Sequence, residues 1–179
     1  MVEIFRAVPE HDVVLRNLFE FYCYDFSEFA AEDVNCEGLF TPARFMSRYW
    51  DDPNWRAYLM KVEGQWAGFV WVVKGSLFNE ARPYPDDEHF SVEEFFIARK
   101  YRRRGLGEQL AAYTFDLYAG VWEVTEIPQN IPAQNFWRRV INRYTNGNFE
   151  EVVFESRTWG KQPMQIFRNM DRAKGNVWR

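Results

Sequence analysis

The sequence contains few cysteines and histidines, and this shortage limits the kinds of site that it can build. Its 179 residues include two cysteines, Cys23 and Cys36, and two histidines, His11 and His89. Two isolated cysteines do not form a disulfide framework, so we expect a reducing, cytoplasmic environment. A zinc site needs three or four clustered ligands, and the sequence offers no such cluster. We therefore expect no metal cofactor.

Long apolar runs and a basic surplus are missing as well. The longest apolar runs, such as Phe69–Val73, are far shorter than the roughly 20 residues that cross a bilayer as a helix. The N-terminus has no charged start followed by an apolar stretch, so we expect no signal peptide. The formal net charge is -4, which argues against a general nucleic-acid binder and mildly favours cationic partners.

Aromatic residues, in contrast, are abundant. They make up 19% of the chain, and hydrophobic residues in total make up 47%. Because each aromatic side chain buries a large apolar area, this composition supports a dense core. The length fits one ordinary domain, so residues 1–179 are predicted to form a single domain.

The order of apolar patterns predicts the elements β-α-α-β-β-β-α-β-α-β-β. Thr41-Pro42 is typical of the start of a helix, here the second one. Later in the chain we expect a strand at Ser91–Ala98, a helix at Gly105–Gly120, a strand at Val121–Ile127 and a helix capped near Asn130. A strand, a helix and a further strand in succession imply a parallel crossover, so the predicted class is mixed α/β.

The most informative segment is the basic turn between the strand and the helix. Unpaired N–H groups at a helix start, the helix dipole, glycines and arginines together favour a bound diphosphate. The turn lacks the Gly-Lys-Ser/Thr of a Walker A loop, and Arg102 replaces the first glycine of the dinucleotide fingerprint. Two alternatives stay open, a basic turn without a ligand and a nucleic-acid patch over residues 99–104. The turn consists of Arg102, Arg103, Arg104, Gly105, Leu106 and Gly107.

Two motifs carry a resemblance to a known family. Residues 102–107 resemble the signature Gln/Arg-x-x-Gly-x-Gly/Ala of the GNAT superfamily of N-acetyltransferases, and residues 130–137 resemble its Asn-x-x-Ala-x-x-Phe-Tyr. The predicted element order is similar to that family over nearly the whole chain. Tyr-Asp-Phe-Ser at 24–27, Glu-Phe-Phe at 94–96 and Phe-Trp-Arg at 136–138 resemble an uncharacterised bacterial branch of the superfamily.

The resemblance implies a fold and a coenzyme. The fold would be a mixed, mostly antiparallel central sheet flanked by helices, with the fourth and fifth strands splayed where the coenzyme binds. The co-substrate would be acetyl-CoA, with its pyrophosphate on backbone N–H groups of residues 102–107. Its pantetheine arm would pair with the backbone of Phe96, Ile97 and Ala98 as an added strand. Asn130 would lie near the coenzyme.

The implied reaction is transfer of an acetyl group to a primary amine. A typical alkylamine has a pKa near ~10.4, so its deprotonation at pH 7 costs about 4–5 kcal/mol and calls for a base. Glu94 is our candidate because some relatives carry an acidic residue at this point of the fourth strand. Glu93 points to the opposite face. A salt-bridged or solvated role is the alternative for both carboxylates. Trp137 replaces the family's tyrosine, and its indole N–H cannot serve as a proton source.

The resemblance also places the end of the first helix beside the acceptor site. Tyr24, Asp25 and Glu28, together with Trp137, are predicted to contact the acceptor, since acidic and aromatic groups suit a cation. An ordinary amphipathic helix would carry the same residue types. Two other functions remain as alternatives, an acyl-CoA-binding sensor without turnover and, after it, a nucleic-acid module. We expect a monomer or homodimer that acts away from membranes on a small or peptide amine.

Overall fold

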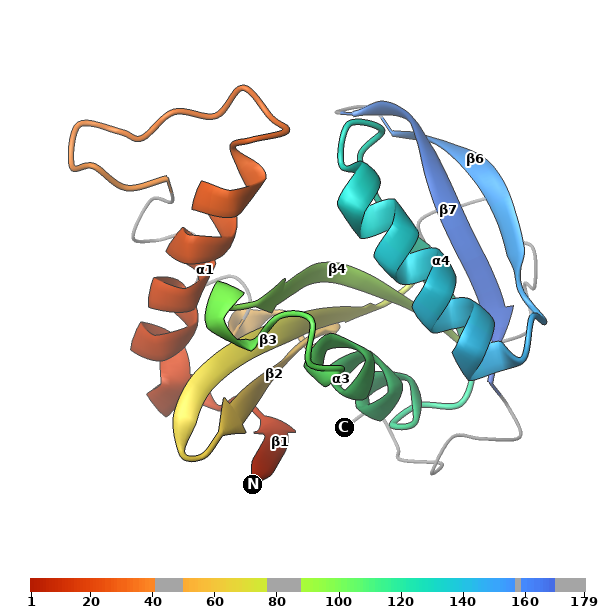
Figure 1. The fold of residues 1–179 in the computed structure, drawn as a ribbon, viewed down its shortest axis with the longest axis horizontal. Coiled ribbons are helices and arrows are strands. Elements are labelled where there is room, and N and C mark those ends of the chain that lie inside the picture. Colours follow the sequence, from red (N-terminus) through yellow and green to blue (C-terminus); the bar gives the residue numbers. More distant parts are fainter. Residues whose placement is uncertain (41–49, 77–87, 157–158, 170–179) are drawn as a thin grey trace. The chain divides into compact units, whose positions relative to one another are not determined.

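The chain folds into helices and the strands of one mixed sheet (Figure 1). The computed structural model describes residues 1–40, 50–76, 88–156 and 159–169. Seven strands lie in the order β1-β2-β3-β4-β5-β7-β6. The strands are β1 Val2–Arg6, β2 Trp55–Val62, β3 Gln65–Lys74, β4 His89–Ile97, β5 Val121–Thr125, β6 Glu150–Ser156 and β7 Gly160–Arg168. The helices are α1 Asp12–Phe26, α3 Leu106–Phe115 and α4 Ile131–Thr145, with short 3-10 turns at Pro9–His11 and Arg99–Tyr101.

This arrangement confirms the predicted fold class. Strands β4 and β5 pair in parallel, whereas β1 with β2, β5 with β7, and β6 with β7 pair antiparallel. The strand predicted at Ser91–Ala98 starts two residues earlier, and the helix predicted to reach Gly120 ends at Phe115. The helix predicted to open at Thr41-Pro42 falls on residues 41–49, which lie outside the described residues.

The pairing of β4 with β5 is short. It runs from His89 opposite Val121 to Val92 opposite Val124, and β4 itself continues to Ile97. Strand β5 stays paired with β7 as far as Thr125. The fourth and fifth strands therefore share only their first parts, as the expected splay requires.

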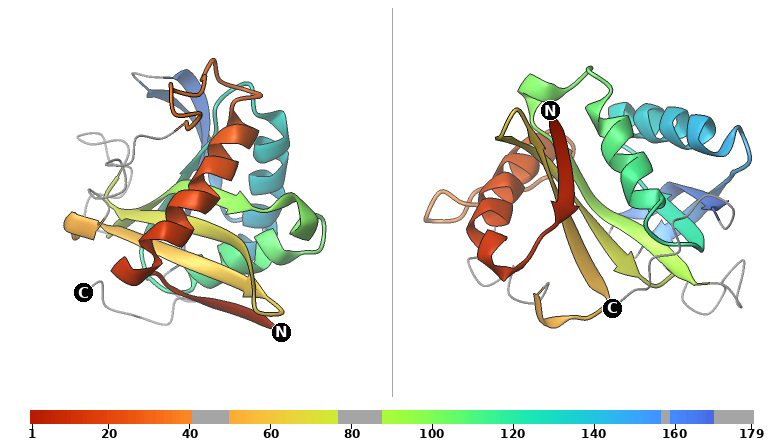
Figure 2. Two further views of the ribbon diagram at one scale, coloured as in Figure 1. Left: turned by 90° about the vertical axis from the view of Figure 1, so that its left-hand side faces the viewer. Right: turned by 90° about the horizontal axis from the view of Figure 1, so that it is seen from below.

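The described residues divide into two compact units. The first comprises residues 1–71 and 94–110, and the second comprises residues 72–93 and 111–179. In the first unit, α1 lies across one face of the strands (Figure 2). Its apolar residues recur every three or four positions, so one stripe of the helix is buried. That stripe (Leu15, Leu18, Phe19, Cys23) packs on Leu59, Phe69, Trp71 and Phe96.

Gly68 sets how closely β3 and β4 approach each other in the first unit. A Cβ atom at this position would lie 2.2 Å from the carbonyl oxygen of Phe96 and 2.8 Å from Cδ1 of Ile97. Because the first of these neighbours is backbone, the strand would have to move to admit any side chain. The glycine therefore fixes the position of the last part of β4.

The second unit has its own aromatic core. Phe115 lies at its centre, 5.1 Å from the Trp122 ring and 4.8 Å from the Phe167 ring, both nearly edge-on. Helix α4 runs along β7 in Figure 1. It begins where predicted, because the Asn130 side chain accepts a hydrogen bond of 3.0 Å from the backbone N–H of Ala133.

Candidate active site

The basic turn between β4 and α3 has an unusual backbone. Strand β4 ends at Ile97, the 3-10 turn follows, and Arg102 is extended. Arg103 then has φ = 61° and Gly105 has φ = 76°, both in the left-handed region. A residue with a Cβ atom pays roughly 1–2 kcal/mol for this conformation, so surrounding contacts must hold Arg103 there.

The turn presents its polar groups to solvent. Arg102, Arg103, Arg104 and Gly105 are all exposed, whereas Leu106 is buried and anchors the start of α3. The first backbone N–H groups of a helix have no intrahelical acceptor and carry a positive potential. Arg103 makes no ion pair within the described part of the chain. The turn therefore offers backbone donors and at least one unpaired guanidinium to an anion.

Arg102 is bound from two sides, both within the first unit. Its Nε donates a 2.6 Å hydrogen bond to the carbonyl oxygen of Ile97, and its Nη2 pairs with Oδ2 of Asp25. Arg99 pairs with Oδ1 of the same carboxylate, at 2.9 Å from Nε and 2.7 Å from Nη2. Asp25, predicted to contact the acceptor, thus touches the turn that was predicted to bind the coenzyme.

The three residues predicted to pair with pantetheine, the last two of β4 and the one that follows, differ in where their backbone groups are engaged. The N–H group of Ala98 donates 2.8 Å to the carbonyl oxygen of Ala67 on β3. The carbonyl oxygen of Phe96 lies against Gly68, also on β3. The carbonyl oxygen of Ile97 accepts from Arg102. Only the backbone of Ile97 therefore turns away from β3 in this segment, and Arg102 already engages its carbonyl group.

Glu94, the predicted base, lies on β4 and is half-buried, while its neighbour Glu93 is exposed. The Tyr22 hydroxyl, from α1, hydrogen-bonds the Glu94 carboxylate. Burial raises the pKa of Tyr22 well above its ordinary value, and the charge of Glu94 adds to this effect. Tyr22 therefore keeps its proton and acts as a donor that orients Glu94. Nothing in the sequence signalled this pairing beyond the presence of Tyr22 in the aromatic run of α1.

The other predicted acceptor residues lie near the end of α1. Tyr24 has 63% of its surface exposed, and Glu28 is exposed just beyond the helix. Asp25 is mostly buried by its two arginines, with 18% of its side chain exposed. Within the first unit, therefore, α1 brings Tyr24 and Asp25 to the side of the basic turn.

Asn130 and Trp137 belong to the second unit. The Asn130 side chain caps α4, and Trp137 is 5% exposed, with its ring 6.2 Å from that of Phe115. Tyr144, the nearest tyrosine further along α4, donates 2.8 Å to Asp116 and packs on Phe115. Its hydroxyl is thus committed to a structural contact.

Comparison with known proteins identifies the family to which the chain belongs. The sequence profile described as the Acetyltransferase (GNAT) family matches residues 19–141, which include the second half of α1, the basic turn and most of α4. The chain belongs to the GNAT acetyltransferase family. It is accordingly an N-acetyltransferase of the kind that uses acetyl-CoA. No curated protein sequence matches it significantly.

Solved structures share the GNAT fold over almost the whole chain. A GNAT-family acetyltransferase from Streptococcus agalactiae superposes with a TM-score of 0.70 at 13% identity, covering 94% of this chain and 95% of that one. An acetyltransferase from Thermus thermophilus gives a TM-score of 0.65 at 18% identity, covering 94% and 97%. The aminoglycoside acetyltransferase AAC(6')-Ib, in complex with coenzyme A, gives 0.65 at 12% identity, covering 94% and 95%. At these identities the likeness concerns the fold alone.

This GNAT chain also holds a buried carboxyl group that the sequence did not reveal. Glu126 follows β5 and is 5% exposed. Its Oε2 accepts a long 3.4 Å hydrogen bond from Nε2 of Gln165. Its Oε1 and the Oε1 of Gln165 are buried without a hydrogen-bond partner among the described residues. Burial raises the pKa of Glu126 to about 8, although Gln165 and Arg138 act in the opposite direction.

Gln165 links Glu126 to further polar residues of the second unit. Gln165 lies opposite Val124 on β5 and opposite Glu151 on β6, and its Nε2 donates 2.9 Å to Glu151. Arg138 on α4 binds both oxygens of Glu151 at 2.7 and 2.9 Å, which lowers the pKa of Glu151. Glu151 is thus neutralised by an arginine, whereas Glu126 has no such ion pair in the described structure.

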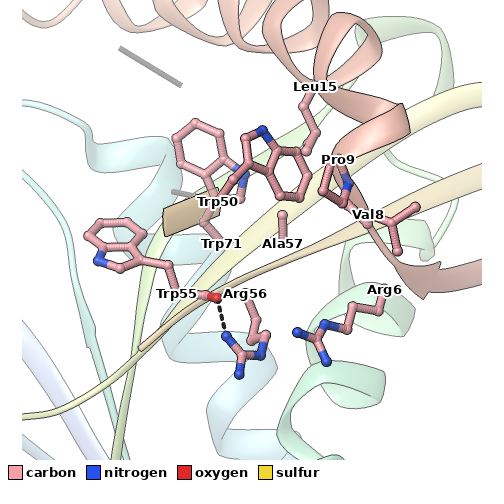
Figure 3. Close-up of a pocket in the computed structure, with 10 residues that line it drawn as sticks. Arg6, Val8, Pro9, Leu15, Trp50, Trp55, Arg56, Ala57 and Trp71 are labelled. Atoms are coloured by element: carbon pink, nitrogen blue, oxygen red, sulfur yellow. Dashed lines mark hydrogen bonds between the residues drawn. The ribbon is translucent and has the colours of Figure 1, made fainter. Parts of the chain in front are cut away.

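One cavity of about 230 Å³ opens in the first unit, and none of the predicted site residues lines it (Figure 3). Hydrogen bonds engage two of the residues that line it. Nε1 of Trp50 donates 2.8 Å to Asp12, and Nη1 of Arg56 donates to the carbonyl oxygens of Pro53 and Trp55. We assign it no part in the reaction. The cavity is lined by Arg6, Ala7, Val8, Pro9, Leu15, Trp50, Trp55, Arg56, Ala57 and Trp71.

A metal site and a membrane-spanning helix are both absent from the described residues. No group of three or more histidine, cysteine, aspartate or glutamate side chains in that part of the chain is placed to hold a metal ion. None of the helices there combines the length and the apolar content that crossing a membrane requires.

Proposed function

We propose that the chain transfers the acetyl group of acetyl-CoA to a primary amine, by direct attack of the amine on the thioester. The observation that carries this proposal is the exposed turn at residues 102–105, which leads into the N-terminus of α3 in a chain of the GNAT family. Its left-handed residues and its free helix N–H groups suit a diphosphate. We also propose that residues 1–179 act as one domain, since β3, β4 and α3 each have residues in both units.

The coenzyme would bind through backbone groups more than through side chains. The N–H groups from Arg103 to Gly107 would hold the pyrophosphate, with Arg103 and Arg104 adding charge, while the N–H group of Arg102 donates to the carbonyl oxygen of Arg99. The backbone of Ile97, which turns away from β3, would meet the pantetheine arm. Asn130 would meet the coenzyme while it also caps α4.

Glu94 would accept the proton of the attacking amine. The nitrogen forms a bond to the acetyl carbon, the bond between that carbon and sulfur breaks, and the ammonium proton passes to the carboxylate. Half-burial and the Tyr22 hydroxyl give Glu94 a defined orientation. The carboxylate acts as a general base that takes up the proton which the amine must lose for transfer at pH 7.

The coenzyme would leave as a thiolate and take its proton from water. Trp137 cannot supply a proton, and the hydroxyl of Tyr144 is bound to Asp116. A thiol has a pKa of about 8.5, so a thiolate is an acceptable leaving group near neutral pH. No protein acid is then required for this step.

The acceptor is proposed to be a cationic primary amine, small or at the end of a peptide. Tyr24 and Glu28 are exposed at the end of α1, where they can contact a cation. We propose a cytoplasmic protein that works as a monomer or homodimer. The basic segment 99–104 is a poor nucleic-acid surface, because Asp25 already pairs with two of its arginines.

A second candidate function is a sensor that binds acyl-CoA without turnover. The observation in its favour is that Trp137, at the position of the family's tyrosine acid, is buried in the aromatic core of the second unit. Such a sensor would bind acetyl-CoA as tightly as an enzyme and release no free CoA with any amine.

Calorimetric titration with acetyl-CoA, and in parallel with ATP and NAD, tests the proposal. We expect micromolar binding of acetyl-CoA alone. Release of free CoA is then followed with a panel of polyamines, aminoglycosides, peptide N-termini and lysine peptides. Turnover with one class identifies the acceptor, binding without turnover supports the sensor, and absence of acetyl-CoA binding refutes both.

A further inference from the structure

The arginines of the basic turn are not equivalent. Arg99 and Arg102 converge on the two oxygens of Asp25, and Arg102 also binds the carbonyl oxygen of Ile97. Arg103 and Arg104 are exposed and pair with no carboxylate within a salt-bridge distance in the described part of the chain. We call the group of Asp25, Arg99 and Arg102 the Asp25 clasp.

The clasp connects segments that are far apart in the sequence. Asp25 lies 74 positions before Arg99 and 77 before Arg102, near the end of α1. The two arginines flank the 3-10 turn that links β4 to the basic turn. The contacts of Asp25 therefore fix both ends of this linker. The carbonyl oxygen of Ile97 is the second partner of the Arg102 side chain.

The residue directly after the clasp needs such support. Arg103 holds a left-handed conformation, with φ = 61°, which a residue with a side chain rarely adopts unless its neighbours impose it. Because Ile97 and Asp25 both bind the Arg102 side chain, the backbone directly before Arg103 is held in place. The N–H groups that follow then point outward before any ligand arrives.

We propose that Asp25 is a positioning residue, which holds Arg99 and Arg102 so that the basic turn is preformed for a diphosphate and Arg103 and Arg104 remain to bind it. This inference rests on the proposed function for the identity of the ligand. It differs from the sequence-based expectation, in which Asp25 contacts the acceptor and Arg102 the coenzyme directly.

A role through charge alone makes the opposite prediction. If Asp25 merely neutralised positive charge, removing its charge would strengthen the attraction of the turn for a diphosphate. If it shaped the turn, removing its charge would weaken binding even though the turn becomes more positive. The sign of the effect therefore separates the two roles.

The test is a double-mutant cycle on the full chain with Asp25→Asn, Arg102→Gln and the combined variant, measured by acetyl-CoA affinity. Each single variant is expected to weaken binding by about tenfold, and the double variant by about tenfold as well, since both break one unit. Asp33→Asn makes the same chemical change at an exposed carboxylate and should leave the affinity unchanged. Additive losses, or affinity in Asp25→Asn equal to or tighter than that of the wild type, overturn the proposal.

Hydrogen exchange without coenzyme gives a second readout that does not depend on the ligand. The backbone amides of Tyr101 and Arg102 donate to the carbonyl oxygens of Ala98 and Arg99. They should exchange faster in Asp25→Asn than in the wild type or in Asp33→Asn, whereas Arg103→Ala should weaken acetyl-CoA binding without a comparable change in their exchange. Unchanged exchange in Asp25→Asn refutes the clasp. If the wild type fails to bind acetyl-CoA, the proposed function fails, and the exchange data still decide whether Asp25 orders the turn.

Discussion

Replacing Glu126 by glutamine should stabilise the protein in a manner that depends on pH. In the folded chain the pKa of Glu126 is about 8, against an ordinary value of 4.5. Between these two pH values the folded state holds a proton that the unfolded state has released. The free energy of unfolding therefore falls as the pH rises from about 4.5 to about 8, and it stays low above that.

The size of the effect follows from the two values. Their difference, at 1.36 kcal/mol per pH unit, corresponds to about 5 kcal/mol. Water and side-chain rearrangement around the ionised carboxylate reduce this penalty, so we expect a gain of about 2–5 kcal/mol for Glu126→Gln at pH 9. The glutamine amide never ionises, and its N–H group can donate to the buried Oε1 of Gln165 that now has no partner among the described residues.

Urea unfolding of the wild type and the variant at pH 5, 7 and 9 measures this gain. The difference in unfolding free energy should be below about 1 kcal/mol at pH 5 and should grow steadily to pH 9. Glu155→Gln, on an exposed position of β6, is the matched control and should show no such growth. A gain that is equal at pH 5 and pH 9, or a variant less stable at pH 9, would refute the reasoning about Glu126.

Three further variants test the active site. Gly107→Trp should abolish acetyl-CoA binding in calorimetry, because the indole would occupy the position proposed for the pyrophosphate; unchanged affinity would show that the pyrophosphate does not bind at this turn. Glu94→Gln should lower turnover by about 100-fold at neutral pH and less where the amine is already neutral, and equal activity at all pH values would rule out Glu94 as the base. Tyr22→Phe removes the donor to the Glu94 carboxylate, so the acid limb of the kcat/KM profile should move to higher pH; an unmoved limb would show that this hydrogen bond does not affect the reaction.

The parts of the fold that could be predicted depend on local pattern. The helix cap at Asn130, the basic turn before α3 and the strand that carries Glu94 all follow from residues that are neighbours in the sequence. The end of the helix was placed too late, at Gly120 instead of Phe115, because the apolar residues after Phe115 pack in the core without being helical.

The long-range side-chain contacts of the site could not be predicted from local pattern. The Asp25 clasp and the bond between Tyr22 and Glu94 join α1 to segments about 70 residues later, and nothing in the local pattern marks either partner. In the sequence, Glu126 is one polar residue within the strand predicted at Val121–Ile127. Only the structure shows that it is buried, with Gln165 as its hydrogen-bond partner.

Gly68 offers a means of altering the active site from outside it. The residue has no side chain with which to meet the coenzyme or the acceptor, yet any side chain placed there must displace the Phe96 carbonyl, and with it the segment of β4 between Glu94 and Ile97. In a library of all single substitutions, position 68 should therefore tolerate nothing but glycine, as though it were a reacting residue. A depleted position in such a map would then report the spacing of two strands and not a chemical role in the reaction.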